Sequence, residues 1–137
     1  MSTATKALAA RFHREIFEQG APAAAAQLCA PDFVWHAPNM PPGMPAGPEG
    51  VKAFAAMVGA GFSDIRITRD DSIAEGERVV DRWTFSGTHT GEFMGAPATG
   101  KRVAVSGIDI FRVADGKLAE LWQNWDQLGM MQQLGVV

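Results

Sequence analysis

The stretch "LWQNWDQLG", Leu121 to Gly129, places Asn124 and Asp126 beside two tryptophans at the predicted end of a strand. Aspartate is favoured at helix N-caps, so Asp126 could simply begin the helix that follows. Alternatively, Asp126 lies in an apolar cavity, where loss of hydration makes a carboxylate a stronger proton acceptor at neutral pH. Asp126 is therefore the first candidate general base, and both roles are compatible at a strand end.

Asp109 and His36 are the other candidates for acid–base chemistry. Asp109 lies within a predicted strand, "SGIDIFRV", where an exposed sheet edge would be the ordinary explanation. His36 follows Trp35 in "FVWHAP" and is either a hydrogen-bonded structural histidine or a donor at a cavity mouth. His13, beside Arg14 on the first predicted helix, is expected to be solvated.

Metal and nucleophile chemistry are not expected from this sequence. The three histidines lack the spacing of metal ligands, although His36 could meet Asp109 or Asp126 in space. The single cysteine, Cys29, lies in an alanine-rich segment and is predicted to be part of the core. No glycine-rich dinucleotide fingerprint follows a strand. We therefore expect neither a metal nor an organic cofactor.

Apolar periodicity places helices first and strands afterwards. Leu8, Phe12 and Ile16 recur at helical spacing up to Gly20, and further helices are predicted over 22–30 and from residue 51. From residue 64 the period becomes two, which predicts two strands joined at Glu75–Gly76 and a hairpin turning at Asp115–Gly116. A short helix over 126–135 closes the chain. This order predicts one α+β domain, residues 1–137, whose twisted sheet curls over the helices around a cavity.

The Asp115–Gly116 turn also predicts a register for the hairpin. Counting from the turn pairs Val113 with Leu118 and Asp109 with Trp122. One face would then gather Asp109, Trp122, Asn124 and Asp126, and we assign it to the cavity. The opposite face carries Ile108, Ile110, Leu121 and Trp125, and we expect it to pack against a second copy of the sheet.

Composition narrows the class of partner. Hydrophobic residues make up 47% of the chain and its formal net charge is −3, so neither a nucleic acid nor a membrane surface is an expected partner. No apolar run approaches the length of a membrane span. A lone cysteine fits a cytoplasmic location.

Several stretches, in this order and spacing, resemble the SnoaL-like polyketide cyclases, also called ester cyclases. They are "PDFVWHAP", "GPEGVKAF", "FSDIRI", "AEGERVVDRWTFSGTHTGEFMGAPATGKRV", "SGIDIFRVADGKLAELWQNWD" and "QLGMMQQLG". The resemblance runs from about Pro31 to Gly135. It implies a cone-shaped α+β barrel of the nuclear transport factor 2-like (cystatin-like) type, with a curved mixed or antiparallel sheet wrapped on N-terminal helices, and usually a homodimer packed through its sheets.

The same resemblance implies intramolecular aldol cyclisation of an aromatic polyketide, without metal or organic cofactor and with a cavity aspartate as acid and base. Asp126 looks equivalent to that aspartate, with His36 or Asn124 as hydrogen-bond donors. A small hydrophobic substrate would be enclosed by aromatic and methionine side chains, namely Trp35, Met40, Met44, Trp83, Phe85 and Trp122. Whether Trp83 and Phe85 face inward stays open, because Arg82 and Thr84 alternate with them along the same strand and take the opposite face. A non-catalytic binding protein, or a hydrolase or isomerase on the same scaffold, is the alternative.

Overall fold

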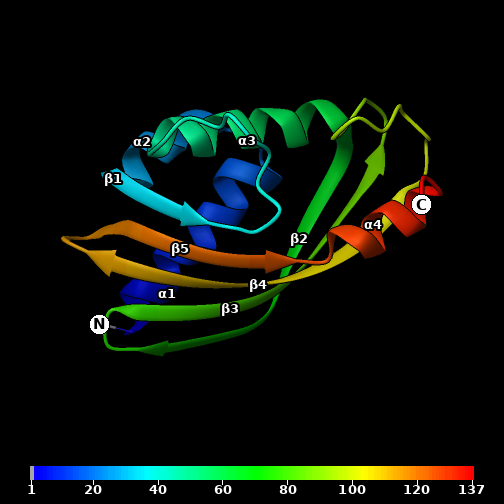
Figure 1. Cartoon of the computed structure of the whole chain (residues 1–137). Coiled ribbons are helices and arrows are strands. Elements are labelled where there is room, and N and C mark those ends of the chain that lie inside the picture. The colour runs from blue at the N-terminus through cyan, green and yellow to red at the C-terminus, as the bar shows by residue number, and fades with distance from the viewer. Residues whose placement is uncertain (1) are drawn as a thin grey trace.

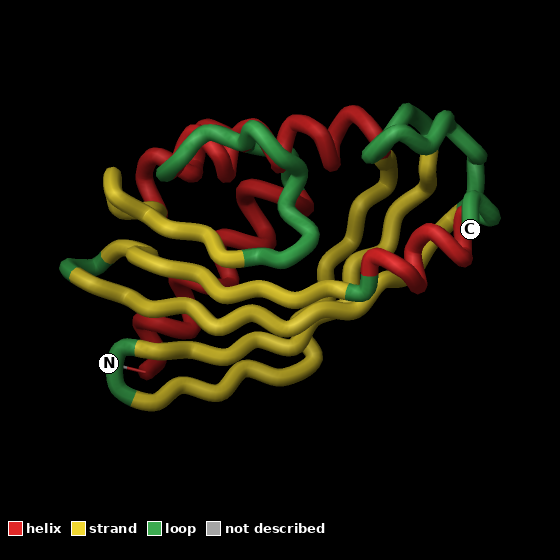
Figure 2. The backbone as a smooth tube through the Cα atoms, in the orientation of Figure 1, coloured by secondary structure: helices red, strands yellow, loops and turns green. Residues whose placement is uncertain are grey.

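The computed structural model describes residues 2–137 and shows one α+β layer structure (Figure 1). The first helices are followed by one strand, then a long helix, four further strands and a closing helix, and the five strands form a single sheet (Figure 2). The helical elements are α1 Ser2–Arg11, a π-helix η1 Phe12–Glu18, a 3₁₀ turn η2 Pro22–Ala24, α2 Ala25–Leu28, α3 Pro48–Gly61 and α4 Gln127–Leu134. The strands are β1 Cys29–His36, β2 Phe62–Glu75, β3 Arg78–His89, β4 Arg102–Ala114 and β5 Lys117–Trp125.

The sheet is mixed, with strand order β1-β5-β4-β3-β2. Strand β1 runs parallel to β5, whereas the other neighbours are antiparallel. Figure 1 shows β2 and β3 curling upward until they reach the end of α3, so that the sheet wraps around the helical layer. The predicted curved sheet on N-terminal helices is therefore confirmed. No helix among residues 2–137 is long and apolar enough to span a bilayer.

The predicted hairpin between β4 and β5 is confirmed at its turn. Asp115 and Gly116 have φ values of 52° and 74°, the left-handed backbone that a tight two-residue hairpin turn requires. Val113 pairs with Leu118, as the count from the turn predicted.

Beyond that pair the predicted register is wrong, because a β-bulge adds one residue to β5. Arg112 pairs with Glu120, so Leu118 and Ala119 are successive residues and both are buried. Asp109 consequently pairs with Gln123 instead of Trp122. Every later side chain of β5 changes face, since the side-chain period of a strand is two.

The first helix widens into the π-helix η1, in which the Gln19 N–H donates to the Arg14 carbonyl. The helix α1–η1 packs against β2 and β3 on one side and α3 on the other. It therefore buries the adjacent residues Phe12 and His13 as well as Ile16. The expectation of a solvated His13 is wrong, because a helix enclosed on two sides buries more than the single stripe that its apolar spacing marks.

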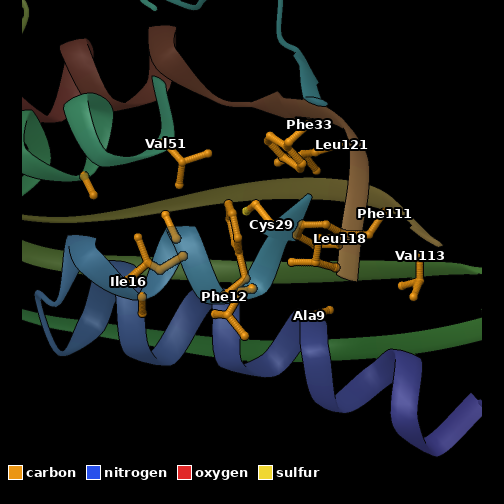
Figure 3. Packing of buried hydrophobic residues seen from close by; sticks show 14 of the residues in the cluster. Ala9, Phe12, Ile16, Cys29, Phe33, Val51, Phe111, Val113, Leu118 and Leu121 are labelled. Atoms are coloured by element: carbon orange, nitrogen blue, oxygen red, sulfur yellow. The ribbon is translucent and has the colours of Figure 1, made fainter. Parts of the chain in front are cut away.

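The core lies between the inner sheet face and the helices (Figure 3). In Figure 3, Ala9, Phe12 and Ile16 of the first helix approach Phe111, Leu118 and Leu121 of the sheet, with Val51 of α3 above them. Cys29 is buried there as predicted, although it begins β1 instead of ending a helix. A second apolar cluster fills the other end of the sheet and includes Phe54, Val58, Phe62, Phe93, Val103, Val105 and Met130.

Candidate active site

Three polar side chains form a row across the inner face of the sheet. Asp109 of β4 pairs with Asp81 of β3 on one side and with Gln123 of β5 on the other. Asp81 and Asp109 are 0% exposed and Gln123 is 8% exposed. Charged groups withdrawn from water this completely are costly unless they are paired, so the partners of each one matter.

His13 lies above the row and joins the two aspartates. Its Nε2 is 3.2 Å from Asp109 Oδ2 and 3.7 Å from Asp81 Oδ2. The first distance is short enough for a hydrogen bond, but neither Nε2 nor the Asp109 oxygens have a well-formed hydrogen bond to any atom of residues 2–137. Catalytic hydrogen bonds are often poorly aligned in free enzymes and tighten when substrate binds. His13 and Asp109 thus form a buried pair with unused hydrogen-bonding capacity.

Asp81, in contrast, is fully engaged by Arg69 of β2. Arg69 Nε donates to Asp81 Oδ2 at 3.0 Å and Nη2 donates to Oδ1 at 2.9 Å, a bidentate pair. The same Nη2 donates to Ser72 Oγ at 2.7 Å and to the Lys6 carbonyl at 3.3 Å. These contacts fix the guanidinium behind Asp81.

A cavity of about 70 Å³ opens next to this cluster. His13 and Gln123 are among its lining residues, and most of the others are aromatic or aliphatic. Trp35, Trp83 and Phe85, which were predicted to bind substrate, line it. The side chains of Trp83 and Phe85 on β3 therefore point inward, which the sequence had left open. Asp109 lies behind His13, at the polar end of an otherwise apolar chamber.

Trp83 owes its position to the glycine opposite. Gly107 pairs with Trp83 across β3 and β4, and a Cβ on Gly107 would lie 2.2 Å from Trp83 Cζ2. The indole therefore covers β4 next to Asp109. In residues 2–137 the buried Nε1 atoms of Trp35 and Trp83 have no hydrogen-bond acceptor. A buried polar group normally has a partner, so these two N–H groups are unused donors on residues that line the cavity.

Met40 and Met44 do not reach this cavity. They line a neighbouring hollow of about 260 Å³ under the loop between β1 and α3. Trp35 lines both spaces.

Asp126 lies outside the cavity, and the expectation that it is held away from solvent is wrong. The residue is exposed, and its Oδ1 accepts a 2.9 Å hydrogen bond from the Gly129 N–H. It is the N-cap of α4, the first of the two alternatives considered above. The bulge in β5 brings Gln123 and Trp125 to the cavity instead.

The same bulge places Trp122 and Asn124 of β5 on the outer sheet face. His36 of β1 pairs with Trp122 and lies on that face as well. His36 stacks on Trp122 with ring centroids 5.3 Å apart, and its Nε2 lies 2.6 Å from Glu120 Oε2. Asn124 is exposed. Leu121 and Trp125, assigned to the outer face, are instead on the inner side. Of the outer apolar residues predicted, Ile108 and Ile110 remain.

Acidic, histidine and cysteine side chains do not converge as metal ligands anywhere in the described part of the chain.

Comparison with known proteins gives this arrangement a family. The sequence profile of the SnoaL-like polyketide cyclases matches residues 7–134. The chain belongs to the SnoaL-like polyketide cyclase family. It is 33% identical over 111 residues to the aklanonic acid methyl ester cyclase DauD of Streptomyces sp. (strain C5), covering 76% of this chain and 68% of that protein. It is 34% identical over 91 residues to the nogalonic acid methyl ester cyclase of Streptomyces nogalater, covering 63% and 67%.

Solved structures of this fold agree. TsrD from Streptomyces laurentii superposes with a TM-score of 0.87 at 33% sequence identity, covering 98% of this chain and 97% of the other. The fold of this SnoaL-like chain is thus of the nuclear transport factor 2-like type, and the similarity to proteins named as cyclases supports an enzyme of the cyclase class.

Proposed function

We propose that this protein catalyses an intramolecular aldol-type cyclisation of a flat, hydrophobic, polyketide-like ester, with Asp109 and His13 acting as one acid–base unit. The observation that carries the proposal is the Asp109–His13 contact of 3.2 Å beside an aromatic-lined cavity. The names of the relatives, which are polyketide methyl ester cyclases, support the substrate class.

The reaction requires two proton transfers and one new carbon–carbon bond. The Asp109–His13 unit takes a proton from a carbon flanked by carbonyl groups, and the C–H electron pair remains on the substrate as an enolate. The enolate carbon attacks a second carbonyl carbon of the same molecule, and the alkoxide formed there receives the proton from the unit. Because the carbon–carbon bond forms between two parts of one substrate and the protein supplies only proton transfers, we propose that no metal or organic cofactor takes part.

The developing oxyanions need donors, and the cavity contains three. The Trp35 and Trp83 indole N–H groups have no acceptor among residues 2–137, and the Gln123 amide lines the cavity beside Asp109. Fixed donors in a site from which water is excluded stabilise developing negative charge effectively. The aromatic walls would hold a flat substrate near its reacting conformation, which lowers the barrier further.

Purified protein and aklanonic acid methyl ester test the proposal. We expect a product of unchanged mass and altered chromatographic retention, formed equally in the presence of a chelator. Asp109→Asn and His13→Gln should each lower kcat by roughly 10²–10⁴-fold, the contribution of positioned acid–base groups.

Asp126→Asn is the matched control, because it alters an exposed aspartate outside the cavity and should leave kcat unchanged. Full activity of Asp109→Asn, or tight ligand retention with no product in the wild-type protein, would overturn the proposal and favour a binding protein.

We also propose a homodimer formed through the outer sheet face, and a cytoplasmic location. Support for the dimer comes from the exposed apolar residues Val34 and Ile108, which are 46% and 49% exposed on this face. The ion pairs Arg112–Glu120 and Arg82–Asp71 on the same face supply both signs of charge.

A further inference from the structure

The Arg69–Asp81 ion pair lies directly behind the proposed acid–base unit, and the chemistry above does not use it. Asp81 is 0% exposed, and both of its oxygens accept hydrogen bonds from Arg69. Replacing a buried ion pair by apolar residues is often neutral or stabilising. The need for a stable fold therefore does not by itself account for a charged pair at this position.

The two aspartates compete for the same imidazole nitrogen. Asp81 and Asp109 pair directly across β3 and β4, and His13 Nε2 is within 3.7 Å of one and 3.2 Å of the other. One N–H can donate well to only one carboxylate. Arg69 neutralises Asp81 and occupies both of its oxygens, whereas Asp109 receives no such partner from residues 2–137.

Arg69 itself has little freedom to exchange partners. Its Nη2 is tied to Ser72 Oγ and to the Lys6 carbonyl, and β2 changes register between Arg69 and Asp71. The guanidinium is thus held on the Asp81 side of the cluster.

We infer that Arg69 and Asp81 are positioning residues that direct the His13 Nε2–H to Asp109 and set the charge around the acid–base unit. Arg69 shields the Asp81 carboxylate, which leaves Asp109 as the acceptor that His13 can serve. The charged groups that face His13 are Asp81 from β3, Asp109 from β4 and, behind Asp81, Arg69 from β2, whereas Gln123 from β5 is neutral. The kinetic consequence of this inference depends on the proposed function, but its electrostatic consequence does not.

The test is the titration of the His13 ring, followed by ¹⁵N NMR in the free protein and assigned with His13→Gln. Arg69→Met exposes His13 to an uncompensated Asp81 carboxylate and should raise the midpoint by about one pH unit, a tenfold gain in proton affinity. Asp81→Asn leaves the Arg69 cation uncompensated and should lower the midpoint by a similar amount. The double variant, which removes both charges, should return the midpoint to within about 0.3 units of wild type.

Two further variants keep the test decisive. Ser72→Ala removes one anchor of Arg69 without changing any charge. It should shift the midpoint in the same direction as Arg69→Met, but by less, and it replaces that variant if Arg69→Met fails to fold. Arg82→Met removes a cation from an exposed pair with Asp71 on the outer face and should leave the midpoint unchanged. A purely structural pair would lower stability in both single variants with midpoints unmoved, and that result would overturn the inference.

Turnover of aklanonic acid methyl ester supplies an independent measurement. Arg69→Met and Asp81→Asn should each lower kcat about tenfold with KM nearly unchanged, and the pH profile should move with the NMR midpoint. If the wild-type protein does not turn this ester over, the proposed function fails while the NMR result still decides the inference. If the midpoints shift as expected but the pH profile of the active enzyme does not change, Arg69 and Asp81 have no positioning role in catalysis.

Discussion

At the scale of single residues, the pairing of polar groups distinguishes the site from the rest of the interior. Asp81 is satisfied by Arg69, while the Asp109 oxygens, His13 Nε2 and the Nε1 atoms of the two cavity indoles have no hydrogen-bond partner within residues 2–137. Two other buried atoms in these residues are also without one, Asn39 Oδ1 and His89 Nε2. Unsatisfied buried groups cost free energy, so the gathering of most of them at one cavity indicates a place prepared for a ligand. A burial pattern alone could not identify it, because Asp81 and Asp109 are equally buried.

Gln123 offers a prediction at this scale, since it is the only neutral member of the polar row. Gln123→Met keeps the length and volume of the side chain but removes its N–H donors. We expect kcat for aklanonic acid methyl ester to fall roughly 10–100-fold with a folded, equally stable protein. Gln123→Glu should be worse, because it places a second carboxylate opposite Asp109. Unchanged kinetics in the methionine variant would assign oxyanion stabilisation to the indoles alone.

Cys29 gives a prediction about reactivity. Burial raises the pKa of its thiol to about 12 from the usual 9.0. At about pH 8 the thiolate fraction of the folded protein is then roughly a thousandfold lower than in the unfolded chain. Iodoacetamide should therefore modify the native protein extremely slowly and the denatured protein readily, as mass spectrometry would show.

The same shift has a defined sign for stability. A raised folded-state pKa adds stability that is present below about pH 9 and is lost as the pH rises toward 12. The free energy of unfolding of the wild type should accordingly decline relative to Cys29→Ala through that range. Rapid alkylation of the native thiol at neutral pH would contradict the buried position.

At the scale of elements, two local irregularities determine which residues meet in the cavity. The bulge at Ala119 reverses the faces of β5, and the π-helix η1 accompanies the inward placement of His13 next to Phe12. Both irregularities are frequent near functional sites. The π-helix leaves no signal in apolar periodicity, and the bulge leaves only one doubled apolar position. The sequence therefore predicted the strands, the turn and the closing helix but assigned Asp126, Asn124 and Trp122 to the wrong surroundings.

One signal in the sequence did point to the bulge. Leu118 and Ala119 are successive apolar residues just after the Asp115–Gly116 turn, where strict alternation would place a polar residue at one of the two. Reading them as a bulge pairs Asp109 with Gln123 and moves Leu121 to the inner face. His13 had no comparable signal, because a histidine beside an arginine on an amphipathic helix is ordinarily solvated.

The helix α4 yields a prediction about Asp126. Asp126→Ala removes the hydrogen bond to the Gly129 N–H and should lower the free energy of unfolding by about 1 kcal/mol, with kcat unchanged. Asp126→Ser, which preserves a capping oxygen, is the matched control and should recover most of the loss. Chemical denaturation measures both. A large loss of turnover with wild-type stability would return Asp126 to the catalytic role that the sequence first suggested.

At the scale of the whole molecule, the sheet separates two surfaces with different properties. Its inner face holds the polar row and the cavity, and its outer face combines exposed aliphatic side chains with Trp122, which lies between His36 and Arg78. The overall order of helices and strands follows from local patterns along the chain, so it could be predicted. The site depends on which of these two faces each strand presents, and one extra residue in β5 is enough to reverse that.

The outer face gives the last prediction, which concerns assembly. Ile108 is 49% exposed near the middle of this face, and burying it with its neighbours against a second copy would remove apolar area from water. Light scattering should therefore give twice the 14.6 kDa mass of one chain for the wild type, and Ile108→Lys should shift the mass toward a single chain. Leu128→Lys, at a residue that is 60% exposed on α4 and not on a strand of the sheet, is the matched control and should remain dimeric. Because the acid–base unit lies on the inner face, a monomeric Ile108→Lys should retain turnover per chain. If the wild type has the mass of one chain at all concentrations, the dimer prediction is wrong and the outer face is a solvated surface of a monomeric enzyme.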